Sequence, residues 1–198
     1  GVNWRLPGGY GAALESLMPP VPVKLNCRVH RVRDAAGGLV LETSMGEVEA
    51  RCAILTVPTP VIADGRIELP KRLSSKREAA AGVPLGLANK AFLKPRRPED
   101  FSVEGHLFGK TDTEATASYN LRPFGRGLIE VFVGGRHAAD LEREGPGAIM
   151  QFAVEELRGL YGSDPIRGME GVIETAWLHD EFSSGSYSHA LPGHAAAR

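Results

Sequence analysis

The sequence has few cysteines and few aromatic side chains, and it contains no long apolar run. Only Cys27 and Cys52 occur among 198 residues. Both lie in strand-like stretches and lack the C-x-x-C spacing of redox and zinc motifs. We therefore expect two small, reduced core residues, with a disulfide between them as the alternative.

Neither sign of charge dominates. The chain carries 23 Lys and Arg against 24 Asp and Glu, a net charge of −1, and scattered basic residues argue against a nucleic-acid partner. Apolar runs such as "AILTV" at 53–57 are far shorter than the roughly 20 residues that cross a bilayer. No charged-then-apolar leader opens the sequence. We expect a soluble, cytoplasmic protein with no nucleic-acid and no membrane partner.

Common catalytic motifs are also missing. The six histidines offer no H-x-x-x-H or H-E-x-x-H pair, so no metal site is expected. In "GSYSH", His189 stands where a serine-nucleophile motif needs its second glycine. The string "GYGAAL" has Leu14 in place of the third glycine of a dinucleotide fingerprint, and no strand precedes it. Gly8 and Gly9 either present backbone amides to an anion or form a plain turn.

Periodicity and punctuation define the expected elements. Apolar residues at helical spacing, with proline or glycine at the ends, predict helices over 9–18, 70–82 and 146–162. Period-two patterns predict strands over 23–33, 39–44, 47–57, 83–94, 127–135 and 171–178, and a hairpin joining 105–109 to 116–121. This interleaving without a strict βαβ rhythm predicts an α/β to α+β fold with mixed sheets.

The stretch "VPLGLANKAFLK" at 83–94 places a lysine inside an apolar run. An isolated charge withdrawn from water costs several kcal/mol or more unless it is paired or wetted. Lys90 shares a face with Phe92 and Lys94, so a solvated strand face is the ordinary interpretation and a buried functional lysine is the alternative. Trp177 and Tyr187, taken singly, are ordinary core or rim aromatics.

Considered together, these segments carry a resemblance. "LTVP" at 55–58, "NK" at 89–90, and a tryptophan followed within ten residues by "GSYS" at 185–188 are its most specific parts. With the segments between them they resemble the flavin-containing amine oxidase family, which includes monoamine oxidases, polyamine oxidases and flavin-dependent histone demethylases. The resemblance covers nearly the whole chain.

The resemblance implies catalytic roles for three residues. Lys90 matches the lysine that holds a water against N5 of the flavin. Trp177 matches an aromatic packed near the isoalloxazine ring. Tyr187 matches one wall of the aromatic cage that guides an amine nitrogen toward the flavin, where ring faces favour a cation.

It also implies FAD contacts. Val29 matches a valine whose backbone contacts the adenine, and Thr56, Val57 and Pro58 match a strand end beneath the cofactor. Gly185 and Ser186 lie in the flavin-proximal "GSYS" segment. Ser186 falls where some monoamine oxidases carry a cysteine bonded to the flavin, and serine cannot form that thioether, so non-covalent FAD is implied.

The chain also departs from the family pattern. The amino-terminal glycine fingerprint is missing, as is the carboxyl-terminal segment with further flavin contacts and the second cage aromatic. We expect a piece of a longer protein: 1–58 from the middle of the FAD-binding domain, 59–178 as the mixed-sheet substrate-binding domain, and 179–198 returning toward FAD. Such a fragment is expected to bind FAD poorly and to be inactive alone.

For the parent protein, the resemblance implies oxidation of an amine to an imine by hydride transfer to flavin N5, with oxygen as reoxidant. A small monoamine or an amino acid is as compatible with the sequence as a polyamine. Two alternatives remain open: a non-catalytic scaffold with an oxidase-like fold, and a related flavin desaturase or oxidase acting on a non-amine substrate.

Overall fold

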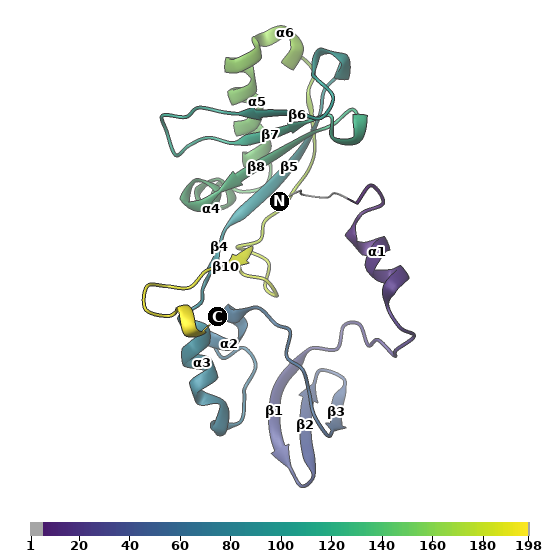
Figure 1. The fold of residues 1–198 in the computed structure, drawn as a ribbon, viewed down its shortest axis with the longest axis vertical. Coiled ribbons are helices and arrows are strands. Elements are labelled where there is room, and N and C mark those ends of the chain that lie inside the picture. Colours follow the sequence, from purple (N-terminus) through teal and green to yellow (C-terminus); the bar gives the residue numbers. More distant parts are fainter. Residues whose placement is uncertain (1–5, 198) are drawn as a thin grey trace.

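A five-stranded antiparallel sheet forms the larger of two lobes in a computed structural model that describes residues 6–197 (Figure 1). Its strand order is β6-β7-β8-β5-β9. The strands are β5 (Ala88–Lys94), β6 (Gly105–Phe108), β7 (Ser118–Leu121), β8 (Ile129–Gly134) and β9 (Glu170–Glu174). The helices of this lobe are α4 (Gly135–Glu144), α5 (Ala148–Tyr161) and α6 (Ser163–Ile166).

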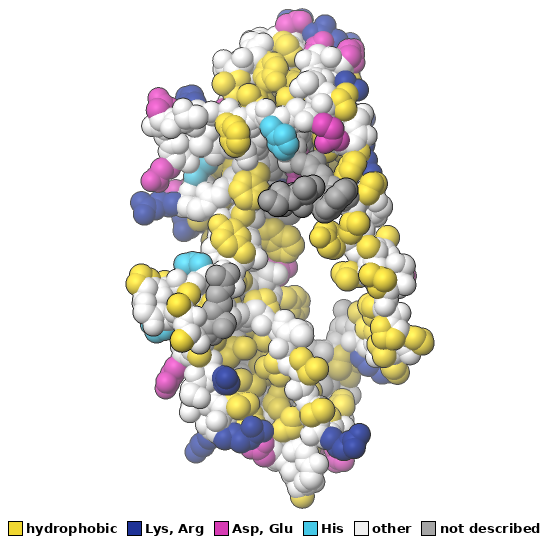
Figure 2. Space-filling model, viewed as in Figure 1, with side chains coloured by type: hydrophobic (Ala, Val, Ile, Leu, Met, Phe, Trp, Pro, Cys, Tyr) yellow, Lys and Arg dark blue, Asp and Glu magenta, His cyan; other side chains and the backbone are white. Residues whose placement is uncertain are grey.

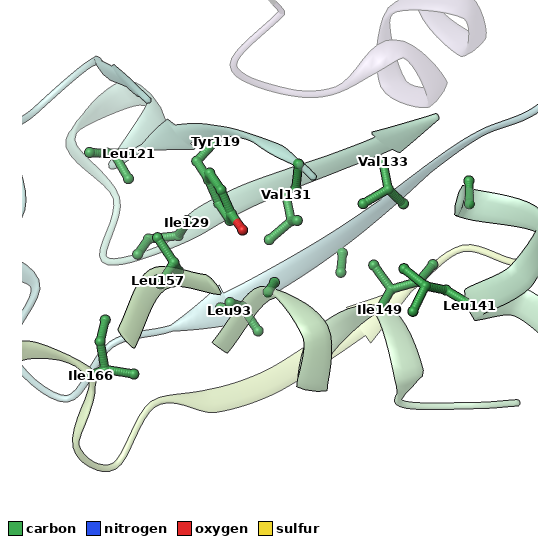
Figure 3. Close-up of a cluster of buried hydrophobic side chains, with 14 of the residues drawn as sticks. Leu93, Tyr119, Leu121, Ile129, Val131, Val133, Leu141, Ile149, Leu157 and Ile166 are labelled. Atoms are coloured by element: carbon green, nitrogen blue, oxygen red, sulfur yellow. The ribbon is translucent and has the colours of Figure 1, made fainter. Parts of the chain in front are cut away.

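The core of this lobe lies between the sheet and its helices. Ile129, Val131 and Val133 alternate along β8 and are buried on the side facing α5 (Figure 3). Ala153 and Leu157 form part of the buried stripe of α5. Period-two burial on a strand and four-residue spacing on a helix are what a sheet packed on a helix requires. Each fully buried aliphatic side chain contributes roughly 1.5–3 kcal/mol.

The smaller lobe is built on a three-stranded antiparallel meander (Figure 1). Its strands are β1 (Val29–Ala35), β2 (Gly38–Thr43) and β3 (Gly46–Ala50), and the helices beside them are α2 (Thr59–Ala63) and α3 (Ser74–Ala81). Between the lobes, β4 (Leu85–Gly86) pairs with β10 (Tyr187–Ser188). The helix α1 (Tyr10–Leu17) stands apart from both lobes and buries none of its residues. Single 3₁₀ turns occur at Lys71–Leu73, Pro98–Asp100, Pro123–Gly125 and Ala195–Ala197.

Most predicted elements are confirmed, and so is the mixture of helices and strands. The three predicted helices correspond to α1, to α3 with the 3₁₀ turn before it, and to α5. The predicted hairpin is β6–β7. The paired ladders of residues 6–197 run antiparallel, and parallel pairing there is limited to one bridge between Arg31 and Glu68.

Three strand predictions were too long. The strand predicted over 171–178 ends at Glu174. The strand predicted from residue 23 begins only at Val29, and the one predicted through residue 57 ends at Ala50. The apolar "AILTV" at 53–57 has no ladder partner among the described residues, and Ile54 is exposed. Apolar alternation favours extended backbone, but a strand also needs a neighbouring backbone to accept its hydrogen bonds.

Two further outcomes differ from expectation. The helix α4 was not predicted, because its polar "RHAADLERE" run has a narrow apolar stripe. Both cysteines are free thiols, but Cys27 is only half-buried and Cys52 is exposed, so neither is a core residue. Within residues 6–197, no helix combines the length and apolarity that a bilayer crossing demands. The same range holds no group of three His, Cys, Asp or Glu side chains placed to bind a metal ion.

Candidate functional site

The strand β5 presents Asn89 and Lys90 to opposite faces of the larger sheet. Asn89 is completely buried on the helix side, whereas the Lys90 side chain is 48% exposed on the open side. The Lys90 ammonium forms an ion pair with Glu130 of β8, whose side chain is only 12% exposed. The lysine therefore lies on an open strand face, as its alternation with Phe92 and Lys94 predicts, and it is paired there.

The buried Asn89 carboxamide connects three segments. Its Nδ2 donates to Glu142 Oε2 of α4 at 2.6 Å. Its Oδ1 accepts hydrogen bonds from Thr175 Oγ1 at 3.1 Å and from the Trp177 amide at 3.3 Å. Because a buried amide without partners is costly, this network fixes where the chain passes after β9. Asn89 thereby determines the backbone position of Trp177.

Glu142 continues this network toward the return segment. Its side chain is 2% exposed, and Oε1 accepts from the His179 amide at 2.8 Å and contacts His179 Nδ1 at 2.9 Å. Desolvation raises the pKa of Glu142, but hydrogen bonds from Asn89 and His179 outweigh it and lower that pKa below the usual 4.5. The carboxyl group is therefore an anion that ties α4 to residues 177–179.

Sequence reasoning missed Asn89 and Glu142 as organising residues. A signal was present for Asn89: it occupies the apolar phase of the β5 alternation, where a polar side chain needs a buried partner. No comparable signal marked Glu142, because a glutamate in a polar helix is ordinarily solvated.

The "GSYS" segment is bound to the start of β5. Ser186 Oγ accepts from the Ala88 amide at 2.9 Å and donates to the Ala88 carbonyl at 2.8 Å. The Gly185 amide donates to the Trp177 carbonyl at 2.8 Å. These bonds bring Trp177, Gly185 and Ser186 together two residues before Lys90.

Glycine is required at position 185. Its φ of +141° is strained for any L side chain, and an added Cβ would lie 2.5 Å from Leu85 Cβ. The neighbouring Gly86 allows the Tyr187 ring to lie against the β4 backbone, since a Cβ there would come within 3.1 Å of Tyr187 Cε2. The Tyr187 side chain stays 55% exposed and that of Trp177 39%.

The predicted cofactor residues line two cavities that meet at one proline. The first, of about 460 Å³, is lined by Val29, Thr56, Val57 and Pro58 among others, with mostly apolar neighbours. The second, of about 340 Å³, is lined by Pro58, Trp177, Gly185 and Ser186, with Leu85 and Ser183. Neither Lys90 nor Tyr187 lines either cavity. The structure thus groups the candidate site into two cavity clusters and a separate Lys90–Glu130 pair.

An open gap separates the lobes on the side of α1 (Figure 2). Apolar side chains border this gap, and the exposed apolar residues of α1 include Tyr10, Leu14 and Leu17. So much exposed apolar surface is typical of a binding region rather than of an ordinary solvent-exposed surface.

Comparison with known proteins identifies the class that this arrangement represents. The sequence profile described as "Flavin containing amine oxidoreductase" matches residues 1–198. The chain belongs to this family of flavin-dependent amine oxidases.

Its relatives include plant demethylases and oxidases. The chain is 30% identical over 211 residues to "Lysine-specific histone demethylase 1 homolog 3" of Oryza sativa subsp. japonica, covering 95% of this chain and 24% of that protein. It is 30% identical over 200 residues to "Protein FLOWERING LOCUS D" of Arabidopsis thaliana, covering 95% and 25%. "Polyamine oxidase 3" of Oryza sativa subsp. japonica is 26% identical over 198 residues, covering 92% and 40%. The chain thus spans about a quarter of the length of the demethylase relatives.

Solved structures share the fold. A double mutant of putrescine oxidase superposes with a TM-score of 0.69 at 23% identity, covering 94% of this chain and 43% of that one. Wild-type putrescine oxidase bound to putrescine gives a TM-score of 0.64 at 22% identity, covering 85% and 38%. The mixed helix-and-strand architecture is therefore that of part of an amine oxidase.

Proposed function

We propose that this chain supplies part of the cofactor site and of the substrate site of an FAD-dependent amine oxidase. The observation that carries the proposal is the grouping of six residues around Pro58. Val29, Thr56 and Val57 lie on one side of that proline, and Trp177, Gly185 and Ser186 lie on the other. Two adjoining cavities suit a long ligand with two different ends.

The chemistry of the two cavities fits the two ends of FAD. The cavity of Val29 and Val57 is lined mainly by aliphatic groups and suits a flat adenine ring. The cavity of Trp177 and Ser186 offers one aromatic wall and backbone of the "GSYS" segment, and it suits the flavin ring. Ser186 has no thiol and its hydroxyl is engaged by Ala88, so the cofactor is held without a covalent bond.

When bound, FAD supplies the electron acceptor for the oxidation of an amine to an imine. The contribution of this chain is to bind, orient and exclude water. Asn89 and Glu142 fix the Trp177 segment, and Tyr187 offers an exposed ring face for an incoming ammonium group. Lys90 lies two residues along β5 from Ala88, which bonds Ser186, and its ammonium group would hold a water beside the bound flavin.

The proposed substrate is a small amine or amino acid. The open face of the sheet next to Lys90 carries Phe92 and Phe132, which suit an apolar substituent, and its carboxylate Glu130 is already paired. An extended polyamine needs several free carboxylates. A lysine side chain within a histone, the substrate class named in the demethylase relatives, is the competing candidate.

The test is expression of the chain with its natural flanking sequence. We expect a yellow protein whose visible flavin absorbance is lost anaerobically on adding an amine and returns, with peroxide formation, on admitting oxygen. A panel of monoamines, amino acids, polyamines and methylated lysine peptides identifies the substrate. A folded but colourless protein would support a scaffold, and a yellow protein that no amine reduces would support a flavin enzyme for a non-amine substrate.

A further inference from the structure

Three adjacent strands place one polar side chain each in a row across the open face of the larger sheet. These are Lys90 of β5, Glu130 of β8 and Asn120 of β7. Asn120 lies directly opposite Glu130 in the β7–β8 ladder. Lys90 lies opposite Phe132 and therefore diagonal to Glu130 in the β5–β8 ladder.

Both oxygens of Glu130 are occupied by this row. Oε1 accepts from Lys90 Nζ, and Oε2 accepts from Asn120 Nδ2 at 3.0 Å. A carboxylate held by two different donors has one orientation, so its negative charge has a fixed position on the sheet.

The exposed fractions of the Lys90 and Glu130 side chains indicate which of the two fixes the position of the other. Glu130 is 12% exposed and leaves a rigid strand flanked by strands on both sides, whereas Lys90 is 48% exposed and has a flexible four-carbon stem. A shielded carboxylate needs a nearby cation, and a flexible lysine loses rotamer freedom when it pairs. Glu130 is therefore the anchor and Lys90 the side chain that it directs.

We propose that Glu130, oriented by Asn120, is the positioning residue that fixes the Lys90 ammonium for its role at the flavin. This inference rests on the proposed function. It adds two residues to the site, neither of which contacts either cavity around Pro58. Glu130 acts through Lys90 and takes no proton or hydride itself.

The first test needs no turnover. Limited acetylation of the protein expressed with its natural flanking sequence, followed by mass spectrometry, measures the reactivity of each lysine amine. Glu130→Gln is expected to raise Lys90 labelling severalfold relative to exposed Lys94 on the same strand. The matched control is Glu155→Gln, which breaks an exposed ion pair with Arg158 on α5, and it is expected to leave the Lys90-to-Lys94 ratio unchanged.

The second test is a double-mutant cycle on the rate of anaerobic flavin reduction by an amine. Glu130→Gln is expected to slow reduction roughly tenfold with Lys90 present, and less than twofold in a Lys90→Met background, because a residue that acts through Lys90 has nothing to direct once Lys90 is removed. If Glu130→Gln protein is insoluble, Asn120→Ala takes its place in both tests with a smaller effect in the same direction.

The outcomes separate this inference from the proposed function. Equal slowing by Glu130→Gln in both backgrounds, or an unchanged Lys90 labelling ratio, overturns the positioning role while the oxidase assignment stands. A protein without flavin, or flavin that no amine reduces, refutes the oxidase assignment itself.

Discussion

Asn89 Nδ2 lies 2.6 Å from Glu142 Oε2, and this contact joins the strand β5 of the larger lobe to the helix α4. Asn89 is fully buried, and its Oδ1 accepts a hydrogen bond from the backbone amide of Trp177. Asn89, the residue before Lys90 of the proposed site, therefore has a structural role. It links β5 to α4 and to the Trp177 backbone, and we call this link the Asn89 bracket. The two residues of "NK" lie on opposite faces of β5: Asn89 stabilises the fold on the buried face, and Lys90 belongs to the proposed site on the open face.

Removing the Asn89 bracket is expected to lower the stability of the fold. Asn89→Ala leaves the Glu142 carboxylate without its closest donor and opens a small cavity, so we expect about 3 kcal/mol of lost stability. The measurement is the midpoint of urea unfolding, compared between variants whose unfolding free energy depends equally steeply on urea concentration. Gln151→Ala, at an exposed position of α5, is the control and is expected to change stability by less than about 0.5 kcal/mol. A loss for Asn89→Ala as small as that of the control would mean that the bracket is not energetically important.

Acid is expected to destabilise the fold through Glu142. Because hydrogen bonding lowers the pKa of Glu142 below its usual 4.5 in the folded state, its contribution is present above that value and is lost as the pH falls through the lower folded pKa. Urea titrations between neutral pH and the acid range measure the slope of the unfolding free energy against pH. Glu142→Gln is expected to flatten it, and an unchanged slope would assign the acid sensitivity to other carboxylates.

A second buried carboxylate clamps the loop between β6 and β7. Glu156 accepts from the Tyr119 hydroxyl at 2.6 Å, from Thr116 Oγ1 at 2.9 Å and from the Ala117 amide at 3.1 Å. Tyr119→Phe removes one charge-assisted bond and is expected to cost about 1.5 kcal/mol. Amide hydrogen exchange across residues 110–117 is expected to quicken. Exchange that quickens equally throughout the lobe would indicate global rather than local loosening.

The positive φ of Gly185 gives a prediction with a control of opposite sign. Gly185→Ala forces a Cβ against Leu85 and is expected to cost about 3 kcal/mol or more. Gly159→Ala lies in α5, where an added Cβ meets no atom within 4 Å, and it is expected to stabilise by about 0.5–1 kcal/mol. Thermal unfolding of both variants measures the difference. Similar values for the two would contradict the close packing of "GSYS" on β4.

Much of the fold could be predicted because local pattern and tertiary packing agree. In β5 the alternation of Ala91 and Leu93 with Lys90 and Phe92 assigns the correct face to each side chain. The pattern failed at 53–57, where apolar alternation lacks a partner strand, and at α4, whose apolar stripe is narrow. Ladder partners depend on distant segments, which local periodicity does not encode.

The candidate site was less predictable than the fold. Short motifs pointed to Pro58, Trp177 and Ser186, and the structure brings these three to one cavity. The partners of Asn89 and Lys90 were not predicted: Glu142 of α4 accepts from Asn89, and Glu130 of β8 pairs with Lys90, and each is a single glutamate among many. Nothing local distinguishes Glu130 or Glu142 from a solvated glutamate, because burial and pairing are properties of the folded chain.

The most direct test of the central claim is a crystal structure of the flavin-loaded protein, expressed with its natural flanking sequence. We expect FAD to span the two cavities at Pro58, with adenine toward Val29, the flavin ring toward Trp177 and Ser186, and Lys90 linked to the ring through one water. A cofactor bound elsewhere, or a Lys90 ammonium turned to bulk solvent away from the ring, would contradict the claim.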